Sequence, residues 1–272
     1  MTTLLNNVVD LPAWAATPGG VRDQARRGLF NGNTSGMAPG FGQGNLAILP
    51  KSWAEDFYRF CQANPTPCPL IGMTQPGDPA VPMLGEDIDL RTDLPRYRVW
   101  RDGVLVEELD DISALWQDEF VGFVLGCSLS FEYALERAGL RVRHVDEGKI
   151  VPMYHTSIQT TPVGPFQGPM VVSMRPYTPE EAKIAYQVCE RLPGAHGAPV
   201  HIGDPAAIGI RDIDNPEEGE PTEIKPGEVP VFWACGVTPQ AAALHAKPPI
   251  LITHSPGHML VSDIPVEQLR LM

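Results

Sequence analysis

Apolar runs bounded by turn-forming residues recur along the chain and predict an α/β protein. Pro199–Ile202, Val229–Ala234 and Ile250–Thr253 are short, continuous and apolar, as expected of buried strands. Between the last two runs, Thr-Pro at the start of Thr238–Ala246 predicts a helix. Since a helix that connects two strands of one sheet usually joins them in parallel, the pattern predicts a mixed, partly parallel sheet flanked by helices.

Capping signals predict further helices. Ser52, followed three residues later by Glu55, predicts a capping box at the start of an amphipathic segment. Thr178–Leu192 opens with Thr-Pro-Glu-Glu, a second strong helix start. Shorter helices are expected over Arg22–Phe30 and Asp110–Phe123.

The middle of the chain alternates like strands. Arg141–Thr161 and Met170–Met174 show this pattern, and Arg101-Asp102-Gly103 predicts a hairpin turn between Tyr97–Trp100 and Val104–Glu107. We therefore expect a smaller β-rich α+β lobe at about 96–174, packed against a main α/β lobe of about 1–95 plus 175–272. No internal repeat is visible, and 1–272 is expected to form one unit.

Charge and cysteine usage restrict the class of protein. The 272 residues carry a formal net charge of −13, so neither nucleic acid nor an anionic membrane surface is an expected partner. The 5 cysteines are scattered and form no CxxC pair, which argues against structural zinc or a disulfide framework. No signal peptide or apolar run of ~20 residues is visible, so a cytoplasmic location is expected. A homo-oligomer is compatible with the sequence, although no motif argues for one.

Polar residues follow the predicted buried strands and mark a candidate site. Asp204, Cys235, Thr238, His254 and His258 would converge at one edge if those strands were parallel neighbours. Each also has a structural interpretation, such as a buried free thiol for Cys235 and a helix cap for Thr238. Pro and Gly between the two histidines disfavour a helical metal-ligand pair, so no metal or cofactor is predicted.

The segment LGCSLSFEYAL at Leu125–Leu135 combines a thiol, two hydroxyls and a predicted helix start. Ser128 and Ser130 are reasonable N-caps, and Glu132 in the first turn suits the helix dipole. The same N-terminus could also hold a carboxylate or an oxyanion, beside a reactive Cys127. These residues alone do not decide between a helix cap and an anion-binding site.

A carboxylate ligand in so acidic a protein needs compensating donors. Arg175 is a candidate because a guanidinium pairs bidentately with a carboxylate, and Arg22 is a second. The Gly-rich segment before position 46 adds the amides Asn33, Gln43 and Asn45, which could surround a polar ligand or lie in a surface loop.

Three motifs resemble a bacterial hydro-lyase family that includes the D-glutamate cyclase domain. They are LGCSLSFEYAL, FWACGVTPQ at Phe232–Gln240 and THSPGHM at Thr253–Met259, with GNTSGMAPGFGQGNLAILP near the N-terminus. The resemblance extends over about 22–263. It implies a carbon–oxygen lyase, and the family's characterised activity is the dehydration of D-glutamate to 5-oxo-D-proline.

The candidate residues are compatible with such a cyclisation. Arg175 would bind the α-carboxylate, Ser128 and Ser130 the oxyanion, and His254 with His258 or Asp204 would move protons. A variant route starts with attack by the Cys127 or Cys235 thiolate on the γ-carbonyl carbon. The alternatives are a non-enzymatic protein that binds a small carboxylate, and a dehydratase of another hydroxy acid that uses His254 and Glu132.

Overall fold

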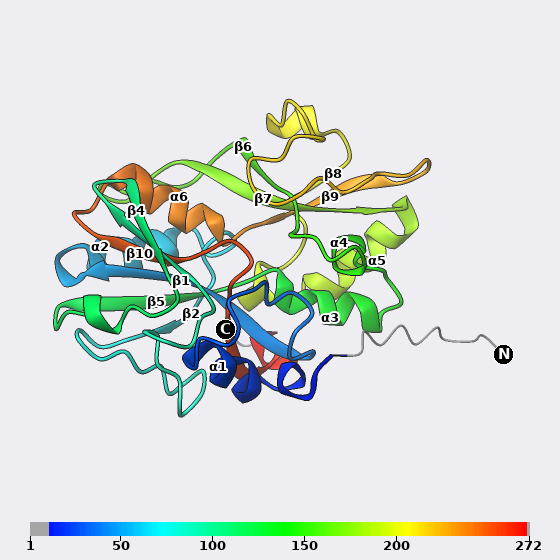
Figure 1. Cartoon of the computed structure of the whole chain (residues 1–272). Coiled ribbons are helices and arrows are strands. Elements are labelled where there is room, and N and C mark those ends of the chain that lie inside the picture. Colours follow the sequence, from blue (N-terminus) through cyan, green and yellow to red (C-terminus); the bar gives the residue numbers. More distant parts are fainter. Residues whose placement is uncertain (1–10, 271–272) are drawn as a thin grey trace.

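The computed structural model describes residues 11–270, which two antiparallel sheets organise (Figure 1). A 7-stranded sheet has the order β2-β5-β1-β10-β3-β4, with β11 paired to β1, and a 4-stranded sheet has the order β6-β7-β9-β8. The larger sheet consists of β1 (Phe41–Pro50), β2 (Leu70–Met73), β3 (Tyr97–Arg101), β4 (Val104–Leu109), β5 (Phe120–Gly126), β10 (Leu251–His254) and β11 (Leu260–Pro265). The smaller consists of β6 (Met153–Gln159), β7 (Pro169–Tyr177), β8 (His201–Ile202) and β9 (Val229–Ala234).

Helices pack around the two sheets, and three of them link one sheet to the other. The α-helices are α1 (Pro18–Arg26), α2 (Lys51–Ala63), α3 (Leu129–Arg137), α4 (Arg143–Asp146), α5 (Pro179–Cys189) and α6 (Val237–Ala246), with short 3₁₀ turns between elements. Helix α3 packs on β1 and on α5, and α5 in turn packs on β7 and β9. Helix α6 contacts both β7 and β10, so it also bridges the sheets. None of the helices within 11–270 is long and apolar enough to cross a membrane.

Strand β1 is buried on both faces, which explains its apolar core sequence. Leu46 and Ile48 belong to the cluster that contains Phe131 of α3. Ala47 and Leu49, which point to the other face, belong to the cluster that contains Phe57 of α2. The two helices therefore cover opposite faces of the 7-stranded sheet.

The prediction of parallel strands is wrong. Strands β9 and β10, on either side of α6, lie in different sheets, and the pairings of both are antiparallel. Ala47 of β1 pairs with Thr253, and Val99 of β3 pairs with Ile252. An apolar run reports that a strand is buried but not which strand lies beside it, and α6 carries the chain from one sheet to the other. The mixed α/β composition is confirmed.

Three local predictions are also wrong. The segment Asp110–Phe123 is not a helix: it contains a 3₁₀ turn at Ser113–Leu115 and the start of β5, whose burial between β1 and β2 overrides the helical pattern. Ser52 is not a cap, because α2 begins at Lys51 directly after Pro50. Arg141–Thr161 begins with the short helix α4 before β6.

Other local signals are confirmed. Helix α5 begins with the predicted capping box, in which Thr178 and Glu181 exchange hydrogen bonds. Strands β3 and β4 form the predicted hairpin, with φ values of 49° at Asp102 and 82° at Gly103, the left-handed pair that a tight hairpin turn requires. The segment 96–174 supplies strands to both sheets, β3 to β5 to the larger and β6 and β7 to the smaller.

Candidate active site

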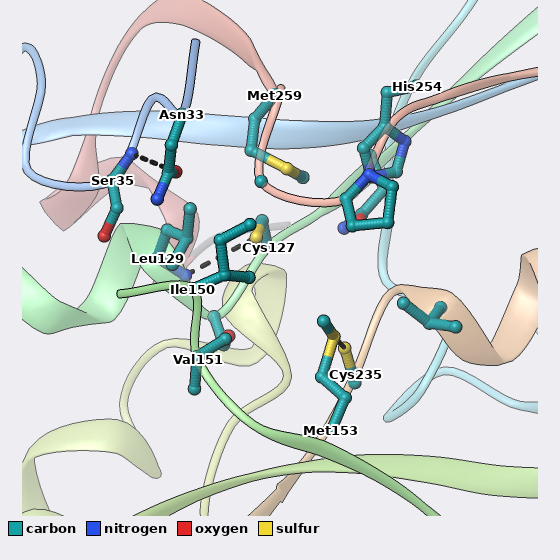
Figure 2. A pocket seen from close by; sticks show the side chains of 15 residues that line it. Asn33, Ser35, Cys127, Leu129, Ile150, Val151, Met153, Cys235, His254 and Met259 are labelled. Carbon is teal, nitrogen blue, oxygen red and sulfur yellow. Dashed lines mark hydrogen bonds between the residues drawn. The ribbon is translucent and has the colours of Figure 1, made fainter. Parts of the chain in front are cut away.

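Strands β5, β9 and β10 all end around one cavity (Figure 2). The volume open to water-sized molecules is about 30 Å³, below the roughly 300–1,000 Å³ typical of small-molecule sites, so a substrate would have to widen the cavity. The polar lining residues are Asn33, Ser35, Asn45, Cys127, Ser128, Cys235 and His254, among apolar side chains such as Ile150, Met153 and Met259. Of the residues in 11–270 that line this cavity, none is Arg, Lys, Asp or Glu.

Cys127 and Cys235 occupy equivalent positions in two strand-to-helix connections. Each thiol residue directly follows its strand, and each helix begins two residues later, at Leu129 for α3 and at Val237 for α6. The intervening residues, Ser128 and Gly236, both have right-handed helical backbone angles and no side-chain cap. The two thiols therefore enter the cavity from the N-terminal ends of two separate helices.

The hydroxyls of Ser130 and Thr238 also have equivalent surroundings, because each makes two hydrogen bonds to one residue of a neighbouring strand. Ser130 Oγ accepts from Gln43 N at 2.8 Å and donates to Gln43 O at 3.1 Å. Thr238 Oγ1 accepts from Val171 N at 3.0 Å and donates to Val171 O at 3.2 Å. Neither hydroxyl lines the cavity; each attaches its helix to a neighbouring strand, β1 for α3 and β7 for α6.

Asn45 occupies the space between the two connections. Its Nδ2 donates to Gly126 O at 2.9 Å, and a Cβ built on Gly236 would lie only 1.9 Å from the same nitrogen. Residue 236 is therefore restricted to glycine by the close approach of Asn45. The Asn45 side chain of β1 therefore packs directly against the connection that leads into α6.

His254 is a neutral hydrogen-bond donor at this site. Leu46 N donates to His254 Nδ1 at 3.1 Å, and the amide Nε2 of Gln240 lies 2.8 Å from the same ring nitrogen. Burial lowers the pKa of His254 to about 3, so the ring is neutral at pH 7. Since Nδ1 accepts, the ring proton resides on Nε2, and His254 can donate a hydrogen bond but has no free nitrogen to act as a base.

Both cavity thiols are protonated at neutral pH. Burial raises the pKa of Cys127 to about 12, although Leu129 N–H donates to its sulfur at 3.5 Å and opposes the effect. Burial likewise raises the pKa of Cys235 to about 11, against hydrogen bonds from the N–H groups of Val237 and Gly236. The Cys235 Sγ also lies 3.5 Å from Met153 Sδ.

A buried ionic network supports the cavity from behind. The Arg175 guanidinium pairs with Glu132, donates to Ser173 Oγ at 3.0 Å and to Ser128 Oγ at 3.1 Å. His144 Nε2 lies 3.1 Å from the same Glu132 oxygen. Burial disfavours the charge of Glu132, but His144 and Arg175 outweigh it and lower the pKa to about 2. Arg175 therefore orients Ser128 rather than facing the cavity.

The predicted site residues divide into two groups. Those that line the cavity are Cys127, Ser128, Cys235, His254, Asn33 and Asn45. Those that lie elsewhere are Ser130, Glu132, Thr238, Arg175, Gln43, Asp204 and His258. Gln43 is bonded to Thr34, exposed Asp204 caps a 3₁₀ turn, and His258 bonds the carbonyls of Pro256 and Asn31. Arg22 is bonded to Asp87, Asp263 and the Val261 carbonyl.

Sequence reasoning missed several contributors. Ser35, Met153 and Met259 line the cavity, Gln240 contacts the lining residue His254, and His144 contacts Glu132 behind the cavity. Ser35 lies in the Gly-rich segment that already carried a candidate amide, so its position was the one available signal. His144 had none, because it belongs to a short helix where strands were expected. No group of three His, Cys, Asp or Glu suited to a metal ion occurs within the described part of the chain.

The family model and two similar curated proteins indicate the same family for this chain. The family model described as D-glutamate cyclase matches residues 121–263, which contain Cys127, Cys235 and His254. A protein of Verminephrobacter eiseniae named "Putative hydro-lyase" is 62% identical over 243 residues, 89% of this chain and 89% of its own length. A Bordetella petrii protein of the same description is 58% identical over 243 residues, 89% of this chain and 92% of its own. The chain belongs to the D-glutamate cyclase family of bacterial proteins that are named hydro-lyases.

Proposed function

We propose that the cavity is the active site of a hydro-lyase that acts on a small carboxylic acid, and that its reaction is cyclisation of D-glutamate to 5-oxo-D-proline. The observation that carries the proposal is the convergence of two helix N-termini, with Ser128 and Asn45, on a cavity without charged side chains. Backbone N–H groups at a helix N-terminus favour a bound carboxylate without a cation. The family match supports the reaction class.

The uncharged lining favours the reactive form of an amino acid. Cyclisation requires a neutral amine and a protonated γ-carboxyl group, whereas free glutamate carries an ammonium and a carboxylate. Burial in an apolar environment disfavours both ions. A proton would therefore move from the ammonium to the γ-carboxylate of the bound substrate, which prepares both reacting groups.

The next step is attack of the amine nitrogen on the γ-carbon. The new C–N bond forms as the carbonyl oxygen becomes an oxyanion, which N–H groups at the start of α3 and the Ser128 hydroxyl would stabilise. Proton transfer from nitrogen to the departing oxygen then releases water, and His254 Nε2–H would donate a hydrogen bond to that oxygen. Holding both ends of one molecule together supplies much of the acceleration.

A proton NMR time course with D-glutamate tests the proposal, with L-glutamate and a no-protein sample as controls. We expect 5-oxoproline signals with D-glutamate and a loss of about 100-fold or more in Ser128→Ala, because an oxyanion donor is removed. Thr161→Ala, at an exposed position, is the matched control. No conversion by folded protein would contradict cyclisation. Binding without turnover would instead favour a small-carboxylate-binding protein, and loss of water from a hydroxy acid a different dehydratase.

A further inference from the structure

The thiol groups of Cys127 and Cys235 have no role in the cyclisation above. The thiols come from different sheets, through β5 and β9, yet both line the same cavity (Figure 2). Each is 7% exposed, and each sulfur accepts N–H groups from the first turn of its own helix. Such N–H groups stabilise a negative charge on sulfur, so either residue can hold a proton or release it.

We propose that Cys127 and Cys235 act as a two-thiol pair that removes the α-hydrogen of a small 2-amino or 2-hydroxy acid on one face and returns a hydrogen on the opposite face. The cavity would thus invert the configuration of the acid as well as bind it. The inference rests on the proposed function only in placing a small carboxylic acid in this cavity.

Every proton and electron pair in this step is accounted for. The thiolate of one cysteine takes the α-proton, and the C–H electron pair moves into the carboxylate to give an enediolate. The thiol of the second cysteine then gives its proton to the α-carbon from the other side and becomes the thiolate. No bond to sulfur other than S–H forms or breaks, and no oxidant or reductant is needed. The N–H groups that hold the carboxylate also stabilise the enediolate.

Burial dominates the ionisation of both thiols, and nearby groups modify it. Near Cys127, negative charge on Cys235 or Glu132 opposes ionisation of the thiol, and the charge of Arg175 favours it. Cys235 faces Glu218, which opposes its charge, and again Arg175. Burial outweighs these contacts for both, so the reactive thiolate is scarce at pH 7 and more abundant in alkaline solution. Exchange should accelerate about tenfold for each pH unit between 7 and 9.

Hydrogen–deuterium exchange in D₂O tests the pair directly, with D-glutamate and L-glutamate as probes and the Cα–H NMR signal as readout. We expect the wild-type protein to exchange the α-hydrogen of both enantiomers. Cys127→Ser should lose exchange of one enantiomer by about 100-fold or more and Cys235→Ser that of the other. Cys61→Ser, a buried thiol outside the cavity, is the matched control and should keep both. Thermal unfolding of each variant, and Cys→Ala at the same positions, separates loss of fold from loss of chemistry.

The outcomes for the pair and for cyclisation are distinguishable. Appearance of 5-oxoproline without α-exchange would overturn the two-thiol pair alone. Exchange without 5-oxoproline would support the pair and overturn cyclisation. Equal loss for both enantiomers in each folded single variant would also overturn the pair, because a general structural role has no face preference.

Discussion

Ser130 and Thr238 make the same two hydrogen bonds in different sheets. Each hydroxyl accepts from the N–H and donates to the C=O of a single residue, Gln43 for Ser130 and Val171 for Thr238. Each lies three residues after a cavity cysteine. A Cys-x-x-hydroxyl unit is thus built twice, and the position of each thiol is fixed by a bond to a neighbouring strand.

Removal of either hydroxyl should destabilise the protein. Ser130→Ala or Thr238→Val removes the hydroxyl that accepts from a buried backbone N–H, at a cost of about 1–3 kcal/mol. Urea unfolding measures the effect. Exposed Ser157→Ala is the control and should stay within about 0.5 kcal/mol of wild type. An equal change in all three variants would argue against this anchoring role.

The ion pair between Arg175 and Glu132 should be a major contributor to stability. Glu132→Gln leaves a buried guanidinium without its counter-charge, which costs about 3–5 kcal/mol. The pKa of Glu132 is lowered from 4.5 to about 2 in the folded protein, so its ionised form binds protons less readily than in the unfolded chain. The contribution is therefore fully present above pH 4.5 and is lost as the pH falls toward 2. Unfolding at pH 7 and pH 3 should show a smaller difference between wild type and variant at the lower pH.

His254 should stay neutral through mildly acidic conditions. Because burial lowers its pKa from 6.5 to about 3, its ring resonances should not move between pH 8 and pH 5 in an NMR titration. The unfolded chain takes up a proton near pH 6.5 and the folded chain does not, so this residue reduces stability as the pH falls from 6.5 toward 3. His254→Gln should lack that part of the pH dependence. A midpoint near 6.5 in the folded protein would contradict the burial argument.

Alkylation should distinguish the two cavity thiols. Burial raises both pKa values, to about 12 for Cys127 and about 11 for Cys235, so Cys235 is expected to carry more thiolate at a pH below both values. Iodoacetamide labelling at pH 8 to 10, followed by peptide mass spectrometry, should therefore modify Cys235 first. Earlier labelling of Cys127 would reverse the predicted order of ionisation.

Gly236 should not tolerate a side chain. In Gly236→Ala the new methyl group would overlap the Asn45 amide, and the resulting shift should cost about 1–3 kcal/mol and distort the cavity. Gly19→Ala in α1 is the control, since the nearest atom lies 4.0 Å from the added Cβ. That change should be neutral or stabilise the helix by up to about 1 kcal/mol. Thermal unfolding separates the two outcomes.

Local signals predicted the elements better than their arrangement. The capping box of α5 and the turn at Asp102-Gly103 depend on residues close in sequence, and both are confirmed. Pairing of β10 with β1 and β3 depends on contacts across 150 residues or more, and apolar runs carry no information about such partners. The antiparallel sheets could therefore not be derived from the pattern.

The candidate site was accessible to sequence reasoning for a similar reason. Residues that follow a buried strand lie at its end whatever the direction of its neighbours, so Cys127, Cys235 and His254 reach one cavity despite the wrong topology. Arg175 was harder, because a sequence does not tell whether an arginine meets a ligand or a buried glutamate. In this protein the Arg175 guanidinium pairs with the Glu132 carboxylate of α3.

The location of the Arg175–Glu132 pair has a mechanical consequence. Arg175 belongs to β7 and Glu132 to α3. The ion pair therefore connects the smaller sheet, whose strand β9 leads to Cys235, with the helix that follows Cys127. The width of the cavity therefore depends on the joint between the two sheets as well as on the loops that line it, such as those at Asn33 and Gly257. A substitution that changes the length or angle of the Arg175–Glu132 pair would change the size of the cavity, and so the length of molecule that fits, without altering any residue that lines it.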